Sequence, residues 1–60
     1  MMNRSEILAK MSEIIKTITE NGRATTQEEL INEFEFEAQE QGWTDEEIKI
    51  AIGSDWFPAF

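Results

Sequence analysis

The strongest constraint on the fold is an apolar stripe within residues 4–21. Its members recur at i, i+1, i+4, i+7, i+8 and i+11, and on a helix they fall in a band about 120° wide. They are Ile7, Leu8, Met11, Ile14, Ile15 and Ile18. Asn3 and Glu6 match a capping box at the start, and Asn21-Gly22 is a typical helix stop. We therefore predict a helix at about 4–21.

A second helix is predicted at about 26–41. Thr26 and Glu29 form a Thr-x-x-Glu capping box. Good helix formers (Gln, Glu, Leu and Ala) dominate the residues that follow, and Gly42 is suited to end the helix. A strand is the alternative, because Glu and Phe alternate strictly in EFEFE at 33–37. The capping box and the flanking residues favour the helix.

A third helix is predicted at about 45–53, with Gly53 as its stop. Thr44 and Glu47 form another capping box. The box outweighs the alternation in IKIAI, which on its own is typical of a strand. The remaining residues, 54–60, form a tail that carries three aromatic side chains.

These elements indicate one all-α domain over residues 1–60, either a small three-helix bundle or a helix-turn-helix-like pack, with an aromatic C-terminal tail. A hairpin that pairs EFEFE with IKIAI would need a ten-residue connection carrying a helix start signal, which makes a poor hairpin loop. Five further apolar residues should pack against the first stripe: Leu30, Phe34, Trp43, Ile48 and Ile52.

One short stretch, QGWTDEEIKIAI at 41–52, resembles part of a known family. It is similar to the Gly-aromatic turn and the following helix of ubiquitin-associated domains. The resemblance covers twelve residues. The further helix that those domains place next has no counterpart in this sequence.

The composition excludes most kinds of chemistry. The chain has 60 residues with no Cys and no His, so it has neither a thiolate nor an imidazole for catalysis or metal binding. Its serines have no His to act as a general base, its glycines are isolated, and no calcium-loop spacing occurs. We expect a protein that is not an enzyme and uses no cofactor or metal. Because a core of this size is marginal, oligomerisation or very regular helix packing must support it.

The sequence also lacks membrane and export signals. No apolar run approaches the ~20 residues that span a membrane. The start, MMNRSEILAK, has no long apolar segment of the kind found in signal peptides. We expect no membrane association and a cytoplasmic location, in the host cytoplasm if the chain is phage-encoded.

The net charge of −8 is unevenly distributed. Residues 1–23 carry a net charge of +1, whereas residues 24–60 hold ten acids and one lysine, a net charge of −9. Nucleic acids and anionic membranes attract basic patches, so we expect no direct contact with either. The acidic part is either a solubilising face or a surface that meets basic groups on a partner.

Four of the acids form a ladder on the predicted helix 26–41. They are spaced i+4, i+4 and i+3, roughly 5–6 Å apart along one side: Glu29, Glu33, Glu37 and Glu40. Each like-charge pair at this spacing costs about 0.2–0.5 kcal/mol, so the ladder does not help the domain to fold. Such regular negative charge could also imitate a nucleic-acid backbone.

Several large apolar side chains do not fit the predicted core. Phe36 falls among the ladder carboxylates, and Ile50 points away from the apolar cluster of its helix. The tail contributes a third group: Trp56, Phe57 and Phe60. Either the tail folds back and covers Phe36 or Ile50, or these side chains form an exposed patch that binds a second copy or another protein.

We predict a non-enzymatic, small acidic protein-binding module, which is an inhibitor or regulator whose partner has a basic surface. Its size and charge resemble those of small acidic inhibitors encoded by phages and mobile elements. The alternatives are a nucleic-acid mimic that occupies a basic groove and a structural homodimer. The predicted partner-binding residues are Glu29, Glu33, Phe36, Glu37, Glu40, Ile50, Trp56, Phe57 and Phe60.

Overall fold

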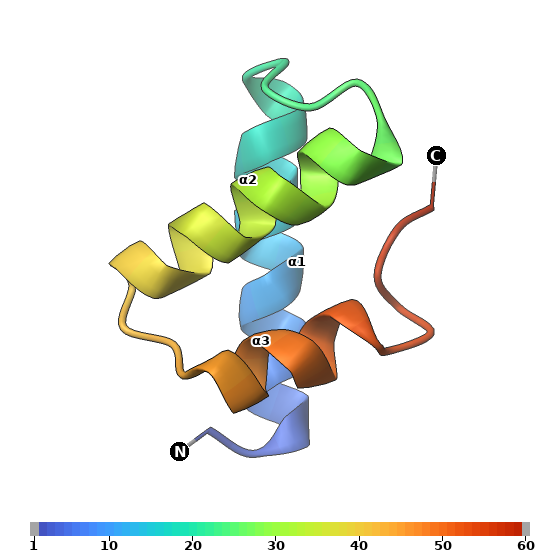
Figure 1. Cartoon of the computed structure of the whole chain (residues 1–60). Coiled ribbons are helices and arrows are strands. Elements are labelled where there is room, and N and C mark those ends of the chain that lie inside the picture. Colours follow the sequence, from blue (N-terminus) through green and yellow to red (C-terminus); the bar gives the residue numbers. More distant parts are fainter. Residues whose placement is uncertain (1, 60) are drawn as a thin grey trace.

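The computed structural model describes residues 2–59, which form three α-helices (Figure 1). These are α1 (Arg4–Glu20), α2 (Gln27–Glu40) and α3 (Asp45–Ile52). The prediction of an all-α three-helix pack is confirmed, and EFEFE is helical. The helix ends differ from the predicted ends by single residues, each of which is a cap: Asn21, Thr26, Gln41 and Gly53.

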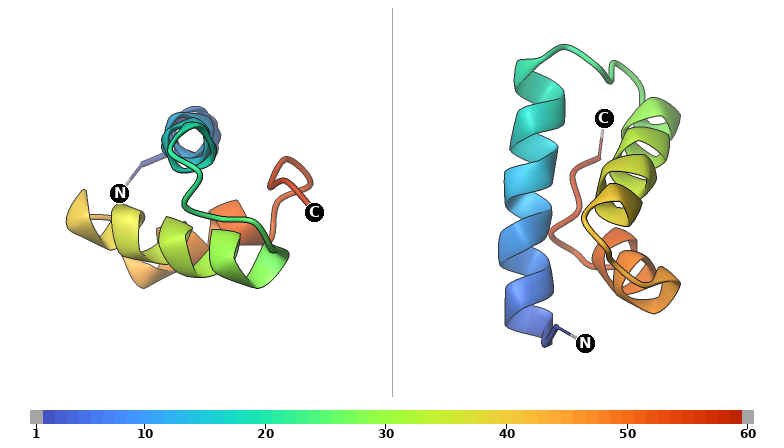
Figure 2. Two further views of the ribbon diagram at one scale, coloured as in Figure 1. Left: turned by 90° about the horizontal axis from the view of Figure 1, so that it is seen from above. Right: turned by 90° about the vertical axis from the view of Figure 1, so that its left-hand side faces the viewer.

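The helices are arranged in two layers. α2 and α3 lie on the same side of α1, and both cross it (Figures 1 and 2). After α3 the chain turns back and runs toward the level at which α2 begins (Figure 1). There the side chain of Gln27 donates a hydrogen bond through Nε2 to the carbonyl of Pro58 (3.0 Å). The tail is thereby tied to the start of α2.

Each helix begins at the N-cap residue that the sequence predicts, but among the described residues the complete capping box forms only at Thr44, where the Glu47 side chain also accepts from the Thr44 N–H. A side-chain oxygen accepts a hydrogen bond from the backbone N–H three residues later: Asn3 from Glu6 (2.8 Å), Thr26 from Glu29 (3.1 Å) and Thr44 from Glu47 (3.2 Å). These N–H groups have no partner inside their helices, so the caps determine where the helices start. Gly22 and Gly42 have φ angles of 63° and 87°, and a side chain at either position would strain the turn.

The core lies between α1 and the α2–α3 layer. Its buried apolar residues are Ile7, Met11, Ile14, Ile15, Ile18, Ala24, Leu30, Phe34, Ala38, Trp43, Ile48 and Ala51. Leu8 and Ile52, which the sequence places in the core, are only partly buried at its margin. Leu8 lies at the edge of the α1 stripe, and Ile52 lies in the last turn of α3.

Phe34 is the centre of an aromatic cluster. Its side chain is fully buried, and two further rings meet it edge to face. The ring centroid of Trp43 lies 5.5 Å from that of Phe34, with the two ring planes at 90° to each other. The centroid of Phe57 lies 5.4 Å away, with the ring planes at 77°. Trp43 precedes α3 and Phe57 belongs to the tail, so one ring holds three parts of the chain together.

Two phenylalanines of α2 should therefore respond very differently to truncation. Phe34→Ala should lower the free energy of unfolding by about 3–5 kcal/mol, because it leaves a cavity in the core. Phe36→Ala should change it by no more than about 0.5 kcal/mol, because that ring faces solvent. Urea unfolding followed by circular dichroism measures both, and Phe34→Leu serves if Phe34→Ala does not fold. Equal losses at the two positions would contradict the orientation of α2.

Candidate functional site

The outward side of α2 carries a large exposed aromatic ring. Phe36 is 55% exposed, whereas Phe34 is completely buried. The reason is the helix geometry, because residues two apart on an α-helix lie about 200° apart around its axis. We call the surface formed by Glu29, Glu33, Phe36, Glu37 and Glu40 the α2 acidic face.

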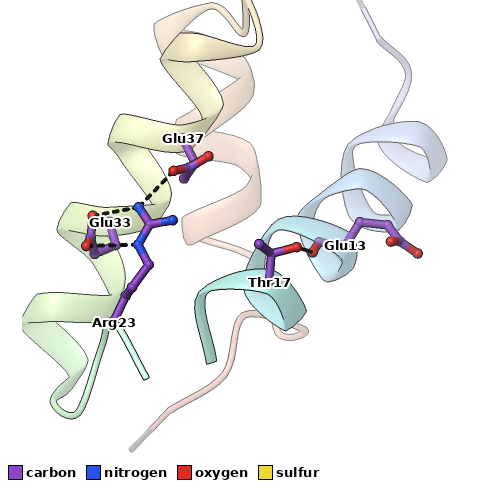
Figure 3. Close-up of polar contacts among 5 residues, drawn as sticks. All are labelled: Glu13, Thr17, Arg23, Glu33 and Glu37. Atoms are coloured by element: carbon purple, nitrogen blue, oxygen red, sulfur yellow. Dashed lines mark hydrogen bonds and ion pairs between the residues drawn. The ribbon is translucent and has the colours of Figure 1, made fainter. Parts of the chain in front are cut away.

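Two carboxylates of the α2 acidic face are not free but paired with Arg23. Arg23 precedes α2, and its guanidinium reaches Glu33 (3.2 Å) and Glu37 (2.7 Å) (Figure 3). Its Nε also donates to Glu33 (3.3 Å). The hydrogen bonds to Glu33, and next to Glu37, raise the pKa of Arg23. The like-charge repulsion expected along the ladder is therefore partly offset inside the molecule.

Glu29 has a capping role. Its Oε1 accepts hydrogen bonds from the hydroxyls of Thr25 (2.8 Å) and Thr26 (3.2 Å). The bond from the Thr25 hydroxyl is the main reason that the pKa of Glu29 is lowered. Glu40, near the other end of α2, is exposed and makes no side-chain hydrogen bond or ion pair with the described residues.

The other predicted site residues do not join this face. Phe57 is half-buried against Phe34, so the tail folds back onto the core ring and leaves Phe36 uncovered. Ile50, expected to point away, is half-buried and packs against the core. Trp56 is 72% exposed and lies beside α1 rather than α2. The prediction for Phe60 lies outside the described residues.

The sequence patterns do not predict that the carboxylate of Glu47 is buried. Glu47 is only 4% exposed and accepts hydrogen bonds from the backbone N–H groups of Thr44 (2.8 Å) and Met2 (2.7 Å). The bond from Thr44 N–H is the main cause that lowers the pKa of Glu47. The capping-box pattern predicts the contact with Thr44, but no local pattern predicts a contact with a residue 45 positions away.

A cleft lies between α1 and α2. Its lining residues are Lys10, Glu13, Ile14, Thr17, Glu37 and Gln41.

Within residues 2–59, no group of three acidic side chains converges as a metal ion would require. No helix in that span is long and apolar enough to cross a membrane.

Comparisons with known proteins yield no relative. No protein-family model, no curated protein and no solved structure matches the chain.

The buried Glu47 should make stability depend on pH. Its folded-state pKa is below the usual 4.5, so it stabilises the fold above that pH and stops doing so as the pH falls through the lowered pKa. Glu47→Gln should reduce Tm most near neutral pH, and its difference from the unmodified chain should shrink in acid. Thermal unfolding from about pH 3 to 7 measures this. The exposed neighbour Glu46→Gln is the control, and a Glu47→Gln effect of constant size would contradict the assignment.

Removal of Arg23 should destabilise the protein in a salt-dependent way. Arg23→Gln leaves Glu33 and Glu37 facing each other without a counter-charge, so Tm should fall at low ionic strength. The loss should diminish between about 0.02 and 0.5 M salt, because salt screens the repulsion. Lys16→Gln makes the same change in net charge at an exposed position and should have a smaller effect. Equal effects would show that the Arg23 pairs contribute nothing.

Proposed function

We propose that this protein is a non-enzymatic binding module whose α2 acidic face meets a basic surface on another protein, with Phe36 as the central anchor. The observation that carries the proposal is the 55% exposure of Phe36 on a helix whose core position is already filled by Phe34. A large aromatic ring surrounded by polar groups is the usual composition of an interface hot spot.

The charge around Phe36 supports a basic partner. α2 carries six acids and no basic residue. Arg23 offsets only Glu33 and Glu37, while the exposed Glu28 and Glu40 have no ion pair within residues 2–59. Unpaired carboxylates at the rim of an interface would steer a basic partner toward the anchor and raise the association rate.

A nucleic-acid mimic is supported less well. Such a mimic needs its carboxylates to carry the contact. Here two of the four ladder acids already bind Arg23, and Glu29 is engaged by Thr25 and Thr26. We therefore favour an anchored protein contact. On this proposal the module acts in the cytoplasm as an inhibitor or regulator that occupies a surface of its partner.

Affinity capture from the native host, with identification by mass spectrometry, would supply the partner. Phe36→Ala should then weaken binding about thirtyfold or more, as expected for a hot-spot residue. Phe36→Leu should retain part of the affinity, and Ser5→Ala, at an exposed position on α1, should retain nearly all of it. Unchanged binding by Phe36→Ala would contradict the proposal.

Replacing unpaired acids of α2 with neutral residues tests separately how much charge contributes to binding. Glu28→Gln with Glu40→Gln should slow association and flatten its dependence on salt. Glu20→Gln with Asp55→Asn removes the same charge from exposed positions outside α2 and is the matched control. A mimic would instead lose its binding on neutralisation and barely respond to Phe36→Ala. A captured protein without a basic surface would also contradict the proposal.

A further inference from the structure

The loop that joins α1 to α2 begins with Asn21-Gly22 (Figure 1). Asn21 is the C-cap of α1 with a ψ of 2°, and Gly22 follows with a φ of 63°. Both residues are exposed, and the side-chain amide of Asn21 makes no hydrogen bond with residues 2–59. Apart from the chain neighbours of Gly22, no described atom lies within 4 Å of the position that a Cβ on Gly22 would occupy. The Asn21 amide is therefore open to water and free to move.

An asparagine that is followed by glycine can lose its side-chain amide without an enzyme. The backbone nitrogen of the glycine gives up its proton and attacks the side-chain carbonyl carbon, a C–N bond forms, and the side-chain nitrogen leaves as ammonia. Water then opens the resulting cyclic imide at either carbonyl. The products are aspartate and isoaspartate, in which the main chain continues through the side chain. Glycine favours this reaction because it has no Cβ to shield the attacking nitrogen.

We propose that Asn21 is a deamidation site of this protein and that the folded end of α1 controls how fast it reacts. At a ψ of 2° the Gly22 nitrogen eclipses the Asn21 nitrogen. It then lies roughly 120° from Cβ about the Cα–C bond, because the substituents of Cα are tetrahedral. Ring closure needs the Gly22 nitrogen beside Cβ, so the folded turn does not react until Asn21 rotates about ψ.

That rotation requires only a local opening of the turn. It withdraws the Gly22 N–H from the carbonyl of Thr19 (3.1 Å) and disturbs the adjacent bond from the Arg23 N–H to the carbonyl of Ile18 (3.1 Å). Backbone hydrogen bonds at an exposed helix end open at a much smaller free-energy cost than the core. The native chain therefore deamidates at Asn21 without global unfolding, but more slowly than an unfolded chain.

The other two asparagines of the chain lack these features. The side-chain oxygen of Asn3 accepts a hydrogen bond from the N–H of Glu6 (2.8 Å), and its next residue carries a long side chain. Asn32 lies inside α2, where the helix holds its backbone, and it is followed by Glu33. We therefore expect modification at one asparagine of the three.

Deamidation places a negative charge at an unfavourable position. The last turn of α1 contains no basic residue, and Glu20 already lies at this negative end of the helix dipole. Isoaspartate also lengthens the main chain two residues before Arg23, whose guanidinium binds Glu33 and Glu37. Modification should loosen those ion pairs and leave more unpaired charge on α2. This inference does not depend on the proposed function of the α2 acidic face.

Peptide mapping by mass spectrometry, during incubation at mildly alkaline pH, measures conversion at each asparagine of the full chain. We expect conversion at Asn21 while Asn3 and Asn32 stay intact, and a rate about tenfold or more higher in urea than in the native chain. Asn21→Gln should remove the more acidic species that ion-exchange chromatography separates, because the longer side chain closes a larger ring. If native Asn21 were as stable as Asn32, the site would be overturned. Equal rates with and without urea would overturn control by the fold.

Asn21→Asp reproduces the aspartate product in a homogeneous sample. It should lower Tm by roughly 2–5 °C at low ionic strength, and less in high salt, because the new charge lies at the negative end of the α1 dipole. Ser5→Asp adds the same charge at an exposed position in the first turn of α1 and should not lower Tm. Equal changes in Tm for the two variants would overturn the effect that we assign to this modification.

Discussion

The fold depends on the edge-to-face packing around Phe34. That ring is completely buried, and it contacts Trp43 before α3 and Phe57 in the tail, with centroids 5.5 Å and 5.4 Å away. A 60-residue chain without disulfides has few other means of holding a short third helix and a tail in place. Fixing Phe34 inward also fixes the rotation of α2, and this places Phe36 in solvent.

Local patterns were sufficient to predict the secondary structure. The apolar stripe of α1 and the capping residues Thr26 and Thr44 located the helices to within one residue at each end. The capping pattern also decided correctly between helix and strand for EFEFE. Such signals are reliable because the residues that form the pattern and the residues whose structure it determines are close together in the sequence.

Contacts between distant residues could not be predicted in the same way. Arg23 binds Glu33 and Glu37 across 10 and 14 residues, and Glu47 binds the N–H of Met2 across 45. Each depends on how the helices pack, which the period of a single helix does not determine. The helical period is enough to predict that Phe36 lies among carboxylates. It does not predict whether the tail covers Phe36, and in the structure Phe57 packs on Phe34 and leaves Phe36 exposed.

The outward side of α2 is proposed to bind a basic partner around Phe36. Amide chemical-shift mapping of the isotope-labelled chain, titrated with the captured partner, tests it most directly. We expect the largest shifts on the outward side of α2, at residues 28–40 and centred on Phe36. Shifts confined to α1 and the tail, with residue 36 unaffected, would contradict the claim.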